Sequence, residues 1–181
     1  MTRPDRSRKT LQIIRLGLPV AVFAFVVGCG YRFSGAPGDN PYPPDIKTIV
    51  LESAVNNTTV TGIETELTNE LRQEFALGSG LTPVRSEGDV ILKTIISSYI
   101  DTPSTYKADG KELTRIGVLR VDCSLHRTAK NKVLWQKELS ASYPYNVTDT
   151  ISETLSNRRR AISKMIKDVT PRIHRSMYDN F

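Results

Sequence analysis

Cysteine and histidine are scarce in this 181-residue chain, which contains two residues of each. The histidines, His126 and His174, are far apart in the sequence, and neither has a cysteine or a carboxylate at the spacing of metal ligands. Protein zinc sites need three or four such ligands. The sequence therefore predicts no metal site, and we expect both histidines at the surface.

The chain also lacks the patterns that accompany common catalytic sites. No serine lies in a nucleophile elbow or in a convincing Ser-x-x-Lys motif, and the scattered glycines form no phosphate-binding loop after a predicted strand. The carboxylates lie on predicted helix surfaces, where solvation explains them better than paired acid–base catalysis. We therefore expect no enzymatic activity and no catalytic residue.

The apolar run near the N-terminus, residues 16–27, is too short to cross a membrane. About 30 Å of hydrocarbon requires roughly 20 apolar residues in a helix. The preceding residues carry five basic side chains against a single acid, Asp5. A buried N-terminal helix is the alternative, but Pro19 and the lack of a polar face argue against it. The pattern predicts a secretory signal peptide over residues 1–28.

The end of this segment resembles the cleavage site of bacterial lipoproteins. Val26, Val27 and Gly28 precede Cys29 in the order of a lipobox. In such proteins the cysteine sulfur receives a diacylglycerol, the chain is cut before the cysteine, and the new amine is acylated. Several acyl chains, at about 0.8 kcal/mol per buried methylene, give stable anchoring. Gly30 follows instead of the aspartate that retains many lipoproteins in the inner membrane, which implies the periplasmic face of the outer membrane.

A strong net charge is missing once this signal is removed. Taking its five bases and one acid from the 25 and 19 of the whole chain leaves 20 and 18, so the net charge falls from +6 to +2. The isoelectric point near 9.4 therefore gives little support to nucleic-acid binding. If Cys29 is acylated, Cys123 has no intramolecular partner, which excludes a disulfide framework.

The mature chain is predicted to contain a tether and one domain. Residues 29–45 hold the lipidated N-terminus and a stretch dense in glycine and proline, typical of a tether, and residues 46–181 suffice for one domain. Residues 46–55, rich in β-branched side chains, predict a strand. Residues 61–64 have the pattern of a capping box. The helix that follows ends at Gly78 and Gly80, and its apolar face is Ile63, Leu67, Leu71 and Phe75.

Three further segments, residues 90–100, 116–127 and 133–143, alternate apolar and polar side chains with the period of a strand. One polar face on each strand predicts an antiparallel sheet that is covered on one side. The alternation places Cys123 on the apolar face as a buried, inert thiol and Tyr99 on the opposite face. The predicted covered faces are Val90, Leu92, Thr94, Ile96 and Ser98; Leu119, Val121, Cys123 and Leu125; and Val133, Trp135, Leu139, Ala141 and Tyr143.

The connections and the last helix complete the predicted order. Residues 101–114 form a long connection with its best turn signal at residues 109–110, and residues 128–132 form a hairpin loop. Residues 81–85 are either an edge strand or the approach to the second strand. Thr150 and Glu153 indicate a capping box for the last helix, and Pro171 should kink or divide it. The apolar face of this helix is Leu155, Ile162, Ile166, Val169 and Ile173.

The resulting order is strand, helix, three strands, helix. We therefore predict a single α+β domain, in which a mostly antiparallel four-stranded sheet has two helices packed on one face.

The order of these segments resembles that of the LPS-assembly lipoprotein family, LptE. In GCGYRFSG, residues 28–35, the cysteine is followed by an aromatic residue, a basic residue and a glycine, as in the family. The strand IKTIVLESAV precedes a helix of the ELTNELRQEF kind, and YKADGK precedes the strand IGVLRVDCSL. KVLWQKELSASYPYNV and RRRAISKMIKDV follow in family order. The resemblance covers the whole mature chain.

This resemblance implies a non-enzymatic role at the outer membrane. Family members plug the lumen of the LPS-assembly β-barrel LptD and assist its assembly and its delivery of lipopolysaccharide to the outer leaflet. Some members bind lipopolysaccharide directly. The alternative is another outer-membrane lipoprotein module, such as an export-machine subunit or a peptidoglycan-synthase activator. The roughly 15 residues between Cys29 and the first strand reach at most about 50 Å, which favours a partner at the membrane.

The candidate contact site is the turn before the third predicted strand. The family carries a basic residue there, beside an aromatic residue and close before a glycine. Lys107 matches it, with Tyr106 adjacent and Lys111 and Arg115 nearby. Lipid A phosphates take lysine or arginine as charge partners. We expect this tip to contact lipopolysaccharide or the barrel wall; a solvated loop is the alternative. The three arginines at residues 158–160 suit an exposed helix face.

Overall fold

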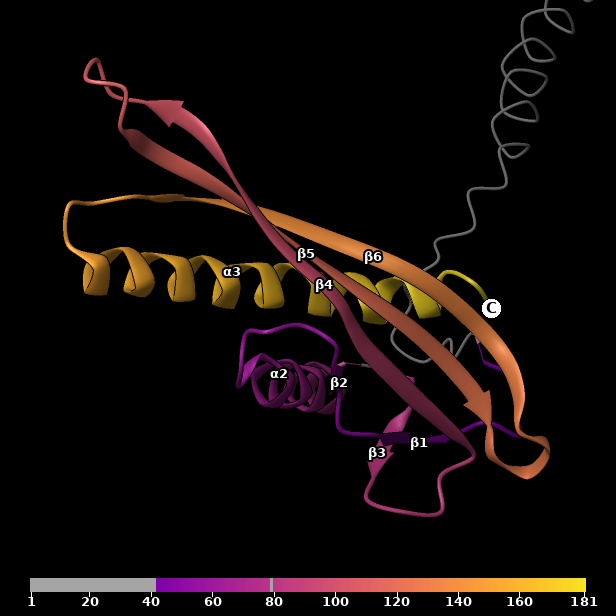
Figure 1. Ribbon diagram of the computed structural model, residues 1–181. Helices are drawn as coiled ribbons and strands as arrows, with labels where there is room; N and C mark the ends of the chain where they lie inside the picture. Colours follow the sequence, from indigo (N-terminus) through magenta and orange to yellow (C-terminus); the bar gives the residue numbers. More distant parts are fainter. Residues whose placement is uncertain (1–41, 79) are drawn as a thin grey trace, which may run out of the picture. The chain divides into compact units, whose positions relative to one another are not determined.

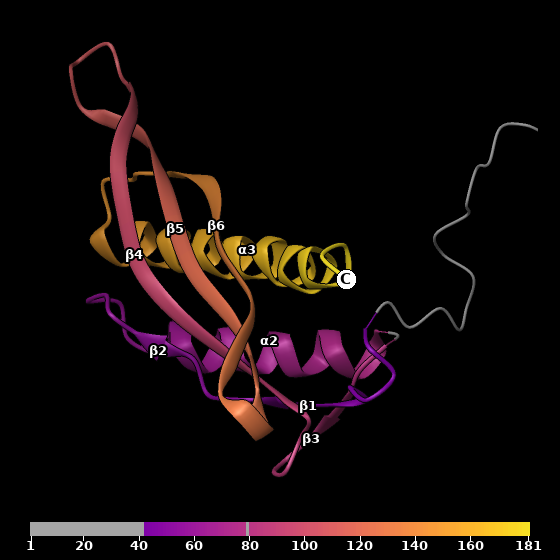
Figure 2. The ribbon, with the colours of Figure 1, turned by 90° about the vertical axis from the view of Figure 1, so that its right-hand side faces the viewer.

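The computed structural model describes residues 42–78 and 80–181. Val26, Val27, Gly28 and Cys29, and with them the predicted signal peptide and lipid anchor, lie outside the described residues. In the described part, a sheet of six strands has two helices on one face (Figure 1, Figure 2). No helix there is both long and apolar enough to span a membrane.

The sheet is mixed. Its strand order is β3-β1-β4-β5-β6, and β2 also pairs with β4. The strands β1, β2 and β3 join the sheet in parallel pairs, whereas β4, β5 and β6 are antiparallel. The elements are β1 (Thr48–Leu51), β2 (Val55–Asn56), α2 (Ile63–Leu77), β3 (Thr82–Val84), β4 (Val90–Tyr106), β5 (Glu112–Arg127), the 3-10 turn η2 (Thr128–Lys130), β6 (Lys132–Asn146) and α3 (Ile151–Tyr178).

The predicted α+β class with two helices on one face is confirmed, but the mostly antiparallel four-stranded sheet was wrong. The single strand predicted over residues 46–55 is divided into β1 and β2. Between them the Ala54 amide donates a hydrogen bond of 2.9 Å to the Thr68 hydroxyl on α2. A crossover through a helix returns the chain in the same direction, so β3 lies parallel to β1. Residues 81–85 therefore contain an edge strand.

The helix α2 begins one residue later than its capping pattern indicates. Its N-cap is Gly62, with φ 87°, a left-handed conformation that glycine adopts at little steric cost. Glu64 still fulfils half of the pattern, because its carboxylate accepts a hydrogen bond of 3.3 Å from the Gly62 amide. Gly78 caps the C-terminus, and the predicted apolar face of the helix is buried.

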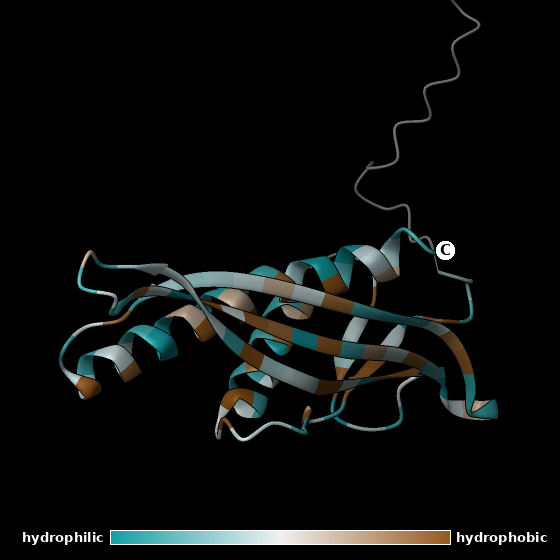
Figure 3. Ribbon diagram, turned by 45° about the horizontal axis from the view of Figure 1, so that its top comes forward, coloured by the Kyte–Doolittle hydropathy of each residue, from teal (hydrophilic) through white to brown (hydrophobic). Residues whose placement is uncertain are grey.

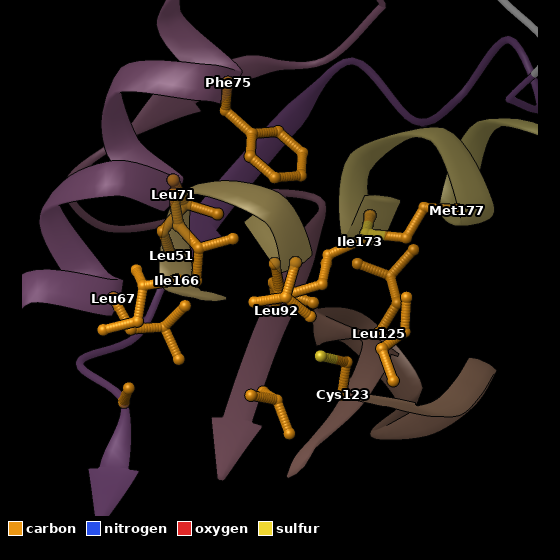
Figure 4. Packing of buried hydrophobic residues seen from close by; sticks show 14 of the residues in the cluster. Leu51, Leu67, Leu71, Phe75, Leu92, Cys123, Leu125, Ile166, Ile173 and Met177 are labelled. Carbon is orange, nitrogen blue, oxygen red and sulfur yellow. The ribbon is translucent and has the colours of Figure 1, made fainter. Parts of the chain in front are cut away.

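The core lies between the sheet and both helices. Figure 4 shows Leu67, Leu71 and Phe75 of α2 and Ile166, Ile173 and Met177 of α3 facing Leu92, Cys123 and Leu125 of the strands. Cys123 is buried as predicted, and burial raises the pKa of its thiol to about 12. This thiol is therefore protonated at neutral pH and unreactive.

Two irregularities in the strand pairing change which side chains face the core. A shift between Ile96 and Ser98 pairs Tyr99 with Leu119, and Tyr99 packs against the core instead of lying on the opposite face. A second shift inserts one residue into β6 between Val133 and Trp135, which leaves Val133 exposed. Each extra residue turns all side chains beyond it to the other face of the sheet. The predictions for Tyr99 and Val133 were therefore wrong.

The hairpin between β4 and β5 is much longer than predicted. The strands reach Tyr106 and Glu112, so the connection predicted over residues 101–114 shrinks to residues 107–111. Its turn lies where predicted, and Gly110 adopts φ 82°. We call residues 98–118 the finger, because its tip projects past the ends of the neighbouring elements (Figure 1). A strand region without a covered face shows no apolar alternation, which is why the sequence pattern missed it.

The last helix, α3, is not divided at Pro171; it continues to Tyr178. Thr150 is its N-cap residue, but the hydroxyl that accepts a backbone amide there is that of Thr154, 2.9 Å from the Thr148 nitrogen. The predicted apolar face is buried with one exception, Leu155, which is 54% exposed and lines an open groove between α2 and α3.

His174 is not the surface residue that we predicted. Its side chain is 18% exposed, its ring edge lies against Phe75 with 4.8 Å between centroids, and its Nδ1 is 3.8 Å from the Glu74 carboxylate. Burial lowers the pKa of His174, and the Glu74 charge only partly opposes this effect. The neutral ring is therefore the form that the folded protein favours.

We expect the stability of the protein to fall as His174 becomes protonated. The folded pKa is lower than the unfolded value of about 6.5, so the neutral ring contributes stability above pH 6.5 that is lost as the pH falls toward the folded pKa. The urea midpoint of the wild type should drop from pH 7.5 to pH 5.5 by more than that of His174→Gln. Equal drops in the two proteins would contradict this prediction.

Candidate functional site

The structure brings Tyr106, Lys107 and Lys111 together at the tip of the finger. The Lys107 amide donates to the Lys111 carbonyl at 2.7 Å, and the Gly110 amide donates to the Lys107 carbonyl at 2.9 Å. These bonds close the turn between the two lysines, and Tyr106, the residue before Lys107, is 60% exposed. The tip thus combines two cations with an accessible aromatic surface.

Both tip lysines have weak acidic partners. Lys107 Nζ lies 3.6 Å from Asp149 Oδ1 in the connection between β6 and α3, and Lys111 Nζ lies 3.8 Å from Asp109 Oδ2 in the same turn. Exposed pairs of this kind contribute about 0–1 kcal/mol. A ligand with several negative charges can therefore replace these partners.

Arg115, the fourth predicted contact residue, lies away from the tip. Its guanidinium is 25% exposed and forms ion pairs of 2.7 Å with both Asp101 and Glu112. The hydrogen bond that Arg115 donates to Glu112 is the largest effect on its pKa, and together with the Asp101 carboxylate it raises the pKa of Arg115 further. Its charge is balanced inside the protein, so Arg115 belongs to a different cluster from Lys107 and Lys111.

This second group, which we call the finger-base cluster, consists of Tyr99, Asp101, Arg115, Tyr145 and Arg158. Asp101 is its centre. Arg158 Nε, from α3, lies 3.1 Å from Asp101 Oδ2, and the guanidinium stacks over the Tyr99 ring at 4.9 Å. The Tyr145 hydroxyl lies near the same carboxylate and helps to lower the pKa of Asp101. The cluster joins β4, β5, β6 and α3 at one point.

The electrostatics of the cluster favour a charged Asp101. Burial opposes ionisation of this carboxyl, but the hydrogen bonds from Arg115 and Tyr145 and the charges of Arg115 and Arg158 outweigh it and lower the pKa of Asp101. Burial, together with the nearby Asp101 charge, raises the pKa of Tyr145 to about 12. At neutral pH the cluster therefore contains one carboxylate, two guanidinium groups and two neutral phenols.

The sequence did not reveal this cluster. Asp101 was assigned to a connection, and Arg158 to an exposed helix face, whereas the structure places Asp101 in β4 with its side chain only 16% exposed. The alternation of Tyr99 and Asp101 is the signal that could have found it. That signal appears only when the register shift after Ile96 is known.

The arrangement supports binding through charge and hydrogen bonds. No group of three or more metal-ligating side chains occurs in residues 42–78 and 80–181.

Another groove in this part of the chain runs between β6 and α3. There Arg172 donates to the Ser140 carbonyl at 2.8 Å, and Lys137 donates to the Ser176 hydroxyl at 2.8 Å. These contacts occupy the outer edge of β6.

Comparison with known proteins identifies the family. The family model for LptE, described as lipopolysaccharide-assembly, matches residues 46–177. No curated protein matches the sequence.

Several solved structures share the fold. Rare lipoprotein B from Shewanella oneidensis is 15% identical, with 71% of this chain and 92% of that chain covered and a TM-score of 0.53. An uncharacterized lipoprotein B from Nitrosomonas europaea is 15% identical, with 80% and 89% covered and a TM-score of 0.53. A Xanthomonas campestris protein grouped in a different family is 13% identical, with 78% and 90% covered and a TM-score of 0.56.

At these identities the solved structures establish the fold alone, and the same fold serves more than one family. The family match carries the assignment, because it extends from the residues before β1 to the last turn of α3. It also confirms the resemblance drawn from the sequence motifs. This chain therefore belongs to the LptE family of lipopolysaccharide-assembly lipoproteins of the outer membrane.

Proposed function

We propose that this protein plugs and helps to assemble the LptD barrel, and that it binds lipopolysaccharide with the tip of the finger. The observation that carries the proposal is the LptE family match over residues 46–177. Lipidation of Cys29, after cleavage behind the Val26-Val27-Gly28 motif, is part of the proposal and would hold the domain at the periplasmic side of the outer membrane.

The surface of the domain is suited to a polar barrel lumen. Within the described residues, the face of the sheet opposite the helices carries no helix; we call it the open face. Lys93, Asp122 and Glu138 lie on it, interspersed with apolar side chains. Figure 3 shows this mixture of hydrophilic and hydrophobic residues along β4, β5 and β6. The interior of a large outer-membrane barrel is polar, so such a face fits its wall better than it fits lipid.

Co-purification from detergent-solubilised outer membranes tests the partner. The tagged full-length protein should bring down a barrel of the LPS-assembly type in a fixed ratio. A second tagged outer-membrane lipoprotein, expressed at the same level, serves as the control and should not bring it down. Recovery of an export machine or a peptidoglycan synthase in place of the barrel would refute the plug and favour the alternative function.

The tip is the part of the finger best suited to lipopolysaccharide. Lipid A carries phosphates, and lysine ammonium groups bind phosphate as point charges. Lys107 and Lys111 lie in one turn, and the exposed Tyr106 comes directly before Lys107 in the chain. Because Asp149 lies 3.6 Å from Lys107, it would compete with a phosphate for that lysine.

Reversing the tip charges should weaken lipopolysaccharide binding. The double variant Lys107→Glu/Lys111→Glu replaces two attractions by two repulsions, and we expect an affinity at least about tenfold lower, equivalent to about 1.4 kcal/mol. Asp149→Asn should raise the affinity about twofold to threefold, because it releases Lys107. Binding of the detergent-solubilised proteins to immobilised lipopolysaccharide measures both effects.

The matched control is Lys130→Glu/Lys132→Glu, which changes the same number of charges in the turn between β5 and β6. This control should bind as the wild type does. Equal loss in both double variants would show unspecific charge attraction and would remove the tip as the binding site.

A further inference from the structure

The finger has few attachments to the rest of the domain. The strand β2 ends at Asn56, opposite Ile96, so beyond this point the outer edge of β4 has no strand neighbour within the described residues. On its other side the finger continues through β5 to β6, and this pairing ends at Thr114 and Asn146. A narrow ribbon of two strands is only marginally stable by itself. The direction of the finger therefore depends on its contacts with β6 and α3.

Asp101 joins the finger to α3 through its two carboxylate oxygens. Oδ1 lies 2.7 Å from Arg115 Nη2, which belongs to the finger, and Oδ2 lies 3.1 Å from Arg158 Nε, which belongs to α3. Arg115 also donates to the Asp101 carbonyl at 3.1 Å. One side chain thus connects the two strands of the finger with the helix.

The position opposite Asp101 adds no apolar side chain to this link. Gly117 pairs directly with Asp101 across the two strands. A Cβ atom at Gly117 would lie 2.9 Å from the Tyr99 hydroxyl and 3.2 Å from Met165 Cε of α3. Apolar contact at this position comes from Tyr99 and Met165, which approach the Gly117 backbone closely, and the ion pairs of Asp101 add a directional link to the helix.

The finger makes two further contacts with the connection before α3. The Val147 amide donates a backbone hydrogen bond of 2.9 Å to the Leu113 carbonyl, and the side-chain pair of Lys107 with Asp149 is weaker. Lys107 Nζ and Asp149 Oδ1 lie 3.6 Å apart. The Asp149 side chain is 83% exposed, so solvent screens this ion pair strongly. An ion pair between exposed side chains does little to fix the positions of the two elements that carry them. Asp101, shielded and held by two guanidinium groups, has the fixed geometry of charge-assisted hydrogen bonds.

We propose that Asp101 is the positioning residue of the finger: by joining Arg115 to Arg158 it fixes the direction of the finger relative to α3, and so the place where the tip lysines meet their ligand. The consequence for the ligand rests on the proposed function. The direction and rigidity of the finger are independent of the proposed function, and both can be measured without a ligand.

Amide hydrogen exchange of the full-length, detergent-solubilised protein tests the proposal. In Asp101→Asn, which keeps the shape of the side chain and removes its charge, the amides of residues 102, 104–106 and 112–116 should exchange at least about tenfold faster. Amides of residues 90–96 and 119–125 should change less than about twofold, because local opening of the finger leaves the core intact. Asp122→Asn, the same change on the open face of β5, is the matched control and should leave the finger unchanged.

A second variant keeps the test valid if Asp101→Asn folds poorly. Arg158→Gln removes only the link to α3, and it should accelerate exchange in the finger to a similar degree. Combined with Asp101→Asn it should give less than the sum of the two single effects, because both changes remove the ion pair between Asp101 and Arg158. Unchanged exchange in the finger, or equal acceleration throughout the sheet, would overturn the positioning role.

Lipopolysaccharide binding separates this proposal from the proposed function. If both hold, Asp101→Asn should weaken binding at least about threefold although both tip lysines are intact. If the finger loosens and the tip charge reversal leaves binding unchanged, the positioning role stands and the tip binding site is refuted. If the finger loosens and binding depends on the tip lysines but not on Asp101, the link between finger direction and ligand is refuted.

Discussion

Replacement of Ile166 by alanine is expected to lower the free energy of unfolding by about 3–4 kcal/mol. Ile166 is 0% exposed and comes from the centre of α3, in the cluster that joins both helices to the sheet (Figure 4). Truncation removes three methyl or methylene groups from this layer and leaves a cavity that the helix and the strands cannot close together. Both the lost burial and the cavity lower stability.

Leu155→Ala is the matched control, because the sequence pattern assigns Leu155 and Ile166 to the same face of the helix. Leu155 is 54% exposed, so its truncation should cost less than about 1 kcal/mol. Equilibrium unfolding in urea, followed by the fluorescence of Trp135, the single tryptophan of the chain, measures both variants. Similar losses for the two would contradict the burial that separates these residues in the structure.

Replacement of Gly117 by valine is the second large effect that we expect, a loss of about 2–3 kcal/mol. The added Cβ would meet the Tyr99 hydroxyl at 2.9 Å and Met165 Cε at 3.2 Å, and the two further methyl groups need space that α3 occupies. To make room, either the helix moves away or the Tyr99 ring shifts and loses its stacking contact with the Arg158 guanidinium. Both outcomes disturb the finger-base cluster.

Ser142→Val controls for the intrinsic preference of valine for strands. Ser142 is exposed on the open face, on the strand next to Val118, so valine there should change the stability by less than about 0.5 kcal/mol. Gly117→Ala should fall between the two, because it adds the Cβ alone. A Gly117→Val protein as stable as the wild type would show that α3 does not approach the finger as closely as the structure indicates.

Periodicity predicted the parts of the fold in which one face is buried over many residues. Ile63, Leu67, Leu71 and Phe75 recur at the spacing of a helix, and all four are buried. The same holds for Leu119, Val121, Cys123 and Leu125, which alternate along β5. Such patterns can be recognised without knowing which element packs against them, because the period of the backbone alone brings the side chains to one face.

The wrong predictions share a different physical cause. An extra residue in a strand precedes Tyr99 and another follows Val133, and one unpaired residue reverses the face of the side chains on its far side. The parallel pairing of β1 with β3 and β4 depends on where α2 returns the chain, which no local pattern encodes. His174 is partly buried against Phe75 of a distant helix, and only the packing of α3 on α2 brings the two rings together.

The candidate site shows the same division. Tyr106, Lys107 and Lys111 were predicted as one tip, since they flank a turn signal within six residues of one another, and the structure places them together. Arg115 was grouped with them by closeness in sequence, but its ion pair with Asp101 assigns it to the base of the finger.

Local order in the sequence was enough to determine the two amphipathic helices, the three long strands, the buried thiol of Cys123 and the motif order of the LptE family, because each rests on neighbouring residues. The tertiary structure alone decided the mixed topology of the sheet, the length of the finger and the finger-base cluster. Those features depend on strand register and on contacts between residues as distant as Asp101 and Arg158, whose charges become partners only when α3 packs on β5 and β6. The free energy of such long-range contacts is gained only in the folded protein, so it produces no periodic pattern in the sequence.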